Sequence, residues 1–424
     1  MMKRPMIVVL AGAVGMLGWG AVLPYQYAYA ASTRGWGTLV AVAASSLFSV
    51  GALLAAPVGG RLADRVPPVR VAVVARSVAA LSALGLLWAG TPGVFLVAMF
   101  MFGVGITAGQ PAQSVLVLRW SGSADRRKVF AWAFTGSSIG MAIGALLAAH
   151  VADLHRVDGL NGAFLLAAGG FVVSALLIAL AGRGDMTDVT DATGVPGVRS
   201  DAIPESHAVS GRQAIRILAA SPALRWVAVV TVLIALGFYA QFESGLPAFA
   251  LTLLDVPEQT VGTAAAVNCL VIVALQMVVV RLTSRRNPAS LLVAVGLIWV
   301  LSWGVLALAM RVPGIAATLF VTTFGIFAVG ETLFAPILNP LSASLAPHGM
   351  VGTTLGLLAA LQTGVSAAGP LLAGLALGAG HGTTFVVIHL VISAGAVLAA
   401  VRLRRVLARP QVTAVAVPPR LSTG

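Results

Sequence analysis

The sequence is poor in charge and nearly lacks cysteine and lysine. Of its 424 residues only 9% are charged, 13 are Asp or Glu, and Cys269 is the single cysteine. Soluble domains carry roughly 25% charged residues, so this composition excludes an ordinary soluble protein. One cysteine permits no internal disulfide, and Cys269 is interpreted as a packing residue.

Motifs for catalysis and for nucleotide or metal binding are also missing. The sequence has no G-x-x-x-x-G-K-[ST] phosphate loop, and its six histidines are scattered without ligand spacing. No catalytic triad is visible. We therefore expect no enzyme activity, no metal and no cofactor, with any energy coupling supplied by an ion gradient.

What the sequence does contain is apolar runs of membrane-spanning length. Hydrophobic residues make up 59% of the chain, and a helix needs about 20 apolar residues to cross a bilayer. The runs lack the alternating polarity of barrel strands. They predict an all-α membrane protein with twelve transmembrane helices, near residues 5–30, 36–60, 69–90, 93–118, 129–152, 161–182, 223–251, 259–281, 288–310, 313–345, 351–379 and 383–403.

The basic residues predict the orientation of these helices. With twelve helices and a cytoplasmic N-terminus, only Arg34, Arg156 and Arg311 fall in outside loops, and Arg76 lies within the third helix. This agrees with the positive-inside rule, and it places both termini in the cytoplasm. The net charge of +13 then reflects proximity to anionic lipid, and nucleic acid is not an expected partner. The alternative is a cleaved secretory signal ending near "AYAAS", which would leave eleven helices and invert the loops.

One long polar stretch divides the chain in two. Residues 183–221, which are rich in Asp, Thr, Gly and Ser, are interpreted as a flexible cytoplasmic linker. The predicted domains are a six-helix bundle at 1–182, this linker, a second six-helix bundle at 222–404, and a cytoplasmic tail at 405–424.

The two halves resemble each other in sequence. "LPYQY" at 23–27 matches "LPAFA" at 246–250, "VGGRLADR" at 58–65 matches "VVVRLTSR" at 278–285, and "GITAGQ" at 105–110 matches "GIFAVGE" at 325–331. All three offsets are about 220 residues. Two repeats around a central site are typical of secondary transporters.

The segment "GGRLADRVPPVR" at 59–70 resembles the signature loop of the major facilitator superfamily, and the second half is similar to its bacterial drug:proton antiporters. Gly60, Leu62, Asp64 and Arg65 match that loop, whereas Pro67 and Pro68 depart from it. The resemblance covers essentially the whole chain and implies twelve helices in two six-helix repeats around a central cavity. It also implies a bacterial plasma membrane protein, which we expect to be monomeric.

This resemblance assigns a cytoplasmic gate to Gly60, Asp64, Arg65 and Arg119. Asp64 is expected to accept hydrogen bonds from the start of helix 11, near residues 349–353, and to interact with Arg119 at the end of helix 4. The alternative is that Asp64 merely caps a loop. Two other family features are absent, because Met99 replaces an intramembrane arginine of helix 4 and Met141 replaces a proline of helix 5.

Polar residues within the apolar runs indicate the helices that surround the cavity, because polar groups are costly against lipid. They occur in helices 1, 4, 7, 8, 10 and 11, while helices 3, 6, 9 and 12 contain no Asn, Asp, Gln or Glu in their interiors. Helices 3, 6, 9 and 12 are therefore expected to face lipid. The predicted cavity residues are Gln26, Gln110, Gln113, Tyr239, Gln241, Asn268, Phe327, Phe334 and Gln362.

Two acidic residues stand within predicted spans, Glu243 and Glu331. A carboxyl group in a poorly solvated site can hold a proton near neutral pH, as proton-coupled transport requires. We take Glu243 as the proton carrier, with Glu331 as its rival. Alternatively, Glu331 and the phenylalanines serve helix packing, with Glu331 hydrogen-bonded to a neighbour such as Gln110.

These features predict proton-coupled export of hydrophobic or amphipathic small molecules, with protons and lipid as the other partners. The nearest alternative is an ion-coupled importer of a nutrient or metabolite. Sites for sugars or organic anions are expected to be richer in hydrogen-bonding or basic residues, and no Arg or Lys lies in the cores of the helices assigned to the interior. An alternative of another class is a membrane sensor or scaffold that transports nothing.

Overall fold

The computed structural model describes residues 3–183, 211–242, 245–378 and 381–408, and these residues form helices without any strand. The N-terminal half begins with α1 (Arg4–Val22), which continues through α2 (Gln26–Ala28) and the π-helix η1 (Tyr29–Thr33). Its other helices are α3 (Gly37–Arg65), α4 (Pro68–Leu87), α5 (Pro92–Trp120), α6 (Arg126–Val151) and α7 (Asn161–Ala181).

The C-terminal half begins with the short helix α8 (Gly211–Ala220), followed by α9 (Pro222–Ile234), the π-helix η2 (Ala235–Tyr239), α10 (Ala240–Phe242) and α11 (Gly245–Thr252). The remaining helices are α12 (Glu258–Thr283), α13 (Pro288–Ala309), the 3-10 turn η3 (Pro313–Ile315), α14 (Ala316–Leu345), α15 (Val351–Ala367), α16 (Gly369–Gly378) and α17 (Gly382–Ala408).

Proline and polar caps fix where several of these helices begin. α4, α5, α9 and α13 each carry proline in the first turn, where its missing N–H costs nothing. The side chains of Thr91, Ser221 and Asn287 accept hydrogen bonds from backbone N–H groups in the first turn of the next helix.

The twelve-helix prediction is confirmed. Among the described residues, eleven helices are long and apolar enough to cross a membrane, and α15 is a shorter apolar helix. Predicted helix 11 is not continuous, because it breaks at Ala368, just before Gly369 and Pro370, where proline cannot donate a backbone hydrogen bond. Helix 7 is also irregular, since α9 passes into the π-helix η2.

The predicted linker and tail boundaries differ from the structure at two places. Residues 211–220, assigned to the linker, form the helix α8, whose isoleucines and leucine lie on one side and its arginines on another. This amphipathic pattern is typical of a helix at a membrane surface. Helix α17 continues to Ala408, four residues into the predicted tail.

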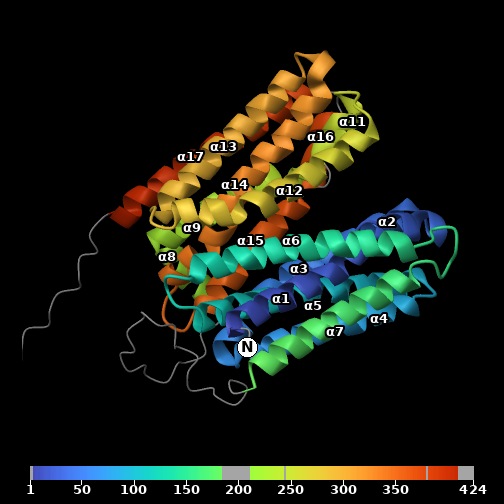
Figure 1. The fold of residues 1–424 in the computed structure, drawn as a ribbon, viewed down its shortest axis with the longest axis horizontal. Coiled ribbons are helices and arrows are strands. Elements are labelled where there is room, and N and C mark those ends of the chain that lie inside the picture. Colours follow the sequence, from blue (N-terminus) through green and yellow to red (C-terminus); the bar gives the residue numbers. More distant parts are fainter. Residues whose placement is uncertain (1–2, 184–210, 243–244, 379–380, 409–424) are drawn as a thin grey trace, which may run out of the picture.

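The two halves form two bundles that meet at one end and diverge toward the other, where α2 and α11 lie (Figure 1). We call these the closed end and the open end. The halves contact each other mainly through α15 against α3 and α5, and through α6 against α12 and α14.

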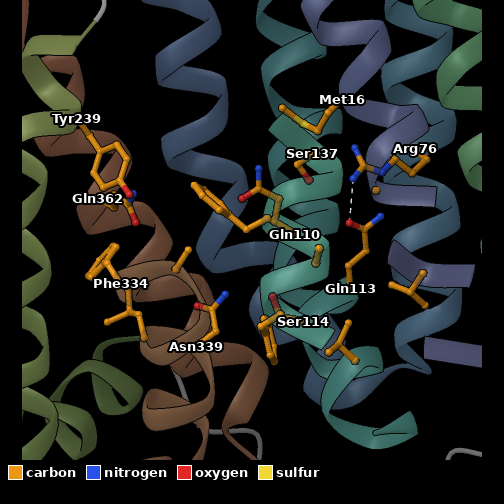
Figure 2. A pocket seen from close by; sticks show the side chains of 18 residues that line it. Met16, Arg76, Gln110, Gln113, Ser114, Ser137, Tyr239, Phe334, Asn339 and Gln362 are labelled. Atoms are coloured by element: carbon orange, nitrogen blue, oxygen red, sulfur yellow. Dashed lines mark hydrogen bonds between the residues drawn. The ribbon is translucent and has the colours of Figure 1, made fainter. Parts of the chain in front are cut away.

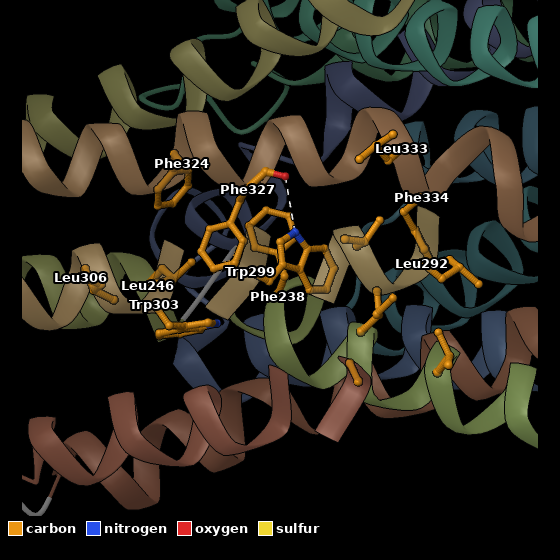
Figure 3. Close-up of a cluster of buried hydrophobic side chains, with 14 of the residues drawn as sticks. Phe238, Leu246, Leu292, Trp299, Trp303, Leu306, Phe324, Phe327, Leu333 and Phe334 are labelled. Carbon is orange, nitrogen blue, oxygen red and sulfur yellow. Dashed lines mark hydrogen bonds between the residues drawn. The ribbon is translucent and has the colours of Figure 1, made fainter. Parts of the chain in front are cut away.

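Aromatic residues fill the core of the C-terminal half. Phe238 stacks on Phe327 with ring centroids 4.3 Å apart, and Trp299 and Trp303 pack edge-on against Phe327. Both indoles find partners. Trp299 Nε1 donates to the Phe327 carbonyl (Figure 3), and Trp303 Nε1 donates to the Gly237 carbonyl. The cluster holds η2 and α14 in a fixed relation, which positions the cavity residues described below.

Glycine allows α1 and α6 to pack with their backbones in contact. A Cβ atom at Gly140 or Gly144 of α6 would overlap the carbonyl oxygen of Ala13 or Leu17, and one at Gly20 of α1 would overlap that of Met141. Small residues at such a crossing are the usual basis of helix association in membranes. The glycines of α6 therefore lie against α1.

We expect Gly140→Ala to destabilise the fold by about 1–3 kcal/mol, because the added methyl group overfills the contact with Ala13. Gly169→Ala on α7 is the matched control, since its Cβ would meet no described atom within 4 Å. Thermal unfolding of the purified proteins in one detergent measures both. A midpoint for Gly140→Ala equal to that of the control would contradict the packing described.

Candidate functional site

A cavity of about 350 Å³ lies between the two halves. Its walls come from α1, α4, α5 and α6 on one side and from η2, α14 and α15 on the other (Figure 2). Ligand cavities commonly have volumes of 300–1,000 Å³. The lining residues are Val8, Gly12, Met16, Arg76, Gln110, Gln113, Ser114, Val117, Phe130, Ala133, Phe134, Ser137, Tyr239, Phe334, Ala335, Leu338, Asn339 and Gln362.

The N-terminal wall is polar along α5. Gln110, Gln113 and Ser114 follow one another on the side of α5 that faces the cavity, and Ser137 joins them from α6. Gln110 and Ser114 are four residues apart, so they share a helix face. Gln113 Oε1 accepts a hydrogen bond of 2.9 Å from Arg76 Nη2.

The C-terminal wall combines aromatic rings with amides. Tyr239 and Phe334 have ring centroids 6.1 Å apart, and Asn339 and Gln362 line the same side. Tyr239 is the last residue of η2. A π-helical turn inserts an extra residue and rotates the next residues of the helix, and such turns are frequent at functional sites.

Glu331 lies behind this wall and is 5% exposed. Its Oε2 accepts a 2.9 Å hydrogen bond from Asn268 Nδ2, and the Tyr239 hydroxyl acts electrostatically on the same carboxylate. Tyr239 therefore lines the cavity and lies next to this carboxylate. The partner considered from sequence, Gln110, is wrong, because Gln110 lines the cavity and the nearer amide of α12 takes its place.

Five of the nine predicted cavity residues line this cavity: Gln110, Gln113, Tyr239, Phe334 and Gln362. The other four do not. Gln26 is buried in α2, Gln241 is buried in α10, Asn268 binds Glu331, and Phe327 belongs to the aromatic core. Polarity within a helix identified groups that avoid lipid, but it did not separate cavity contacts from contacts within a bundle. Glu243 lies outside the described residues.

Arg76 is the charged residue of the cavity wall that sequence reasoning missed. It belongs to α4, the third helix, which was expected to face lipid, yet its side chain points inward and is 2% exposed. Helix 3 was excluded because only Asn, Asp, Gln and Glu were considered. The signal was an arginine in the middle of an apolar span, which by itself indicates an interior position.

At the closed end, Asp64 joins α3 to the N-terminus of α15. Its Oδ1 accepts a 2.6 Å hydrogen bond from the Gly352 N–H, and its Oδ2 accepts 2.6 Å bonds from the Thr353 N–H and hydroxyl. Arg119 acts electrostatically on the same carboxylate. A carboxylate at a helix N-terminus is favoured by the unpaired N–H groups and the helix dipole. These are the contacts that the signature loop implied, and the gate role itself stays a prediction.

The other two predicted gate residues lie beside this contact. A Cβ at Gly60 would overlap the Gly352 carbonyl oxygen, so α3 and α15 approach with their backbones in contact. Arg65 is the last residue of α3.

A second contact between the halves has the opposite chemistry. Arg127, at the start of α6, donates hydrogen bonds of 3.2 Å to the carbonyls of Thr283, Ser284 and Arg286 at the end of α12. A cation is favoured at a helix C-terminus for the same reason that an anion is favoured at an N-terminus. The closed end is thus held by one anion and one cation, each on a helix terminus of the other half.

Comparison with known proteins supports the family that the sequence resembled. The family model described as the major facilitator superfamily matches residues 8–370. No curated protein sequence gives a significant match.

Solved structures with the same fold cover nearly the whole chain. A bacterial homologue of the iron transporter ferroportin, in an outward-facing state, is 18% identical with a TM-score of 0.72, covering 96% of this chain and 100% of its own. The superfamily transporter FucP in the outward conformation is 17% identical with a TM-score of 0.71, covering 94% and 98%. The human organic anion transporter MFSD10 is 17% identical with a TM-score of 0.66, covering 95% and 99%.

The family match, the two six-helix bundles and the cavity between them lead to one assignment. This chain belongs to the major facilitator superfamily of multi-pass membrane transporters, and it is not an enzyme.

Proposed function

We propose that this transporter exports hydrophobic or amphipathic small molecules across a bacterial plasma membrane in exchange for protons. The observation that carries the proposal is the cavity between the halves, where apolar and amide side chains line one wall and Tyr239 connects the other wall to the buried Glu331. Such a cavity can hold an apolar molecule and orient it through a few polar groups.

The closed end supports alternating access as the mechanism. Asp64 and Arg127 bridge the two halves at that end, while the bundles diverge at the open end (Figure 1). Most of the basic loops are at the closed end, which the positive-inside rule places in the cytoplasm. The conformation then faces outward, and rocking of the halves around the cavity would expose it to the other side.

We propose Glu331 as the proton-binding group, since it is the acidic side chain within a described span that is linked to the cavity. Asn268 donates to its Oε2, and the Tyr239 hydroxyl lies next to the same carboxylate. A substrate that moves the Tyr239 hydroxyl would change the surroundings of this carboxylate and so couple substrate to proton. Glu243 remains the other candidate.

The proposal is tested by cellular accumulation of a panel of fluorescent amphipathic cations, anions and neutral compounds. Cells that overexpress the transporter should accumulate at least one compound less than cells that lack it, and a proton uncoupler should remove the difference. Higher accumulation on overexpression would instead identify an importer. Equal accumulation of every compound would favour the sensor or scaffold.

Replacing the proton carrier should abolish coupling without removing the cavity. We expect Glu331→Gln to lower proton-driven export about tenfold or more in inverted membrane vesicles, because the amide cannot bind and release the proton. Glu243→Gln is measured beside it. Collapse of export in Glu243→Gln with normal pH dependence in Glu331→Gln would transfer the role to Glu243.

Weakening the contact of Asp64 with α15 should open the closed end. Asp64→Asn presents an amide donor to the N–H groups of Gly352 and Thr353, and loss of one charged hydrogen bond corresponds to about a tenfold shift in a conformational equilibrium. The readout is labelling of a cysteine at Ser114, in a Cys269→Ser background, by an impermeant maleimide added to inverted vesicles. Labelling should accelerate.

The matched control is Asp125→Asn, because Asp125 is exposed and pairs with Lys128 near the same end. Labelling of the Asp64→Asn protein at the rate of this control would show that the Asp64 contact does not hold the end closed.

A further inference from the structure

The cavity contains a positive charge that nothing in the described part of the protein neutralises. Arg76 is 2% exposed, and among the described residues no Asp or Glu forms an ion pair with it. Guanidinium groups keep their proton in proteins. An isolated buried charge is costly unless it is paired or fully hydrogen-bonded, so the cost of this one depends on the partners of each guanidinium nitrogen.

Only part of the guanidinium is satisfied. Arg76 Nη2 donates to Gln113 Oε1 at 2.9 Å, and Cζ lies 5.6 Å from the centroid of the Phe171 ring. Nε and Nη1 have no hydrogen-bond partner among the described residues. The nearby Ser174 hydroxyl is committed to the Ala11 carbonyl at 2.6 Å. A cation–π contact contributes about 0.5–2 kcal/mol, and it does not replace a counter-ion for a buried charge.

The unpaired groups at this place are all donors. Because Gln113 presents its oxygen to Arg76, its Nε2 points elsewhere, and that nitrogen is also buried without a partner in the described structure. Two guanidinium nitrogens and one amide nitrogen therefore lack acceptors beside one cavity (Figure 2). A group that satisfies them has to accept several hydrogen bonds and carry negative charge, as a carboxylate does.

The protein backbone is shaped to admit the guanidinium. A Cβ at Gly15 of α1 would lie 3.3 Å from both Cζ and Nη1, and one at Gly109 of α5 would lie 4.0 Å from Nε. The charge is thus held between α1, α5 and α7 while remaining part of the cavity wall. The opposite wall bears Tyr239 and Phe334, which suit an apolar body (Figure 2).

We propose that Arg76 and Gln113 form a binding subsite for an anionic group, so that the substrate is an amphipathic organic anion, such as a carboxylate on an apolar or aromatic body. This proposal rests on the proposed function in one respect, because both take this cavity as the place where the substrate binds. The subsite narrows the proposed substrate class to organic anions, whereas the sequence alone did not favour an anion site.

The test uses 2-naphthoate as the probe and its neutral amide, 2-naphthamide, as the matched comparison. Equilibrium dialysis against the full chain in zwitterionic-lipid nanodiscs measures both, with empty nanodiscs subtracted. Wild-type protein should bind the acid about tenfold tighter than the amide, the ratio expected for one charged hydrogen bond. Binding of the acid no tighter than the amide, or of neither compound, would overturn the proposal.

Three variants assign the preference to the subsite. Arg76→Gln should remove the preference for the acid, so that the ratio of the two affinities falls to about one. Gln113→Glu supplies an internal carboxylate to Arg76, so this variant should also lose the preference for the acid. Arg311→Gln, the same change at an exposed arginine, should retain the wild-type ratio.

Gln113→Glu keeps the test valid if Arg76→Gln does not fold, because it leaves the arginine in place and adds an ion pair. Persistence of the acid preference in Gln113→Glu would assign Arg76 to helix packing. Equilibrium binding needs neither a proton gradient nor a direction of transport. A preference for naphthoate without proton-driven export would therefore contradict the proposed function and support the subsite. Proton-driven export without a preference for naphthoate would support the proposed function and contradict the subsite.

Discussion

The bilayer imposes the constraint on which this structure depends, because a polar group facing lipid has no water to bind. Every strongly polar side chain of the spans must therefore turn inward and find a partner there. Asn268 satisfies Glu331, and Asp64 satisfies the N-terminus of α15. At Arg76 the described protein satisfies only one guanidinium nitrogen, and this group lies at the cavity.

The fold could be predicted from the sequence because length and hydropathy are nearly sufficient to define a membrane helix. Gly and Pro mark the breaks between helices, and the offset of about 220 residues between matching segments revealed the repeat. The interruptions within helices were not predictable in the same way. The π-helix ending at Tyr239 arises within an apolar sequence without proline, where no local signal marks an added residue.

The site was predictable only in part, for a physical reason. Polarity identifies an inward side chain, whereas the depth to which it reaches depends on how neighbouring helices cross. Gln113 and Asn268 were equivalent by sequence, yet one lines the cavity and the other supports a carboxylate behind its wall. Arg76 lies on a helix that was expected to face lipid, yet its side chain points inward, because glycines on two other helices leave space for it.

The glycine contact between α3 and α15 has an electrical consequence. With the Gly60 and Gly356 backbones pressed against the opposite helix, no room remains between them for a file of water molecules. Protons move along connected water, so this contact removes one path by which they could leak between α3 and α15. Such leakage would discharge a membrane that stores energy as a voltage.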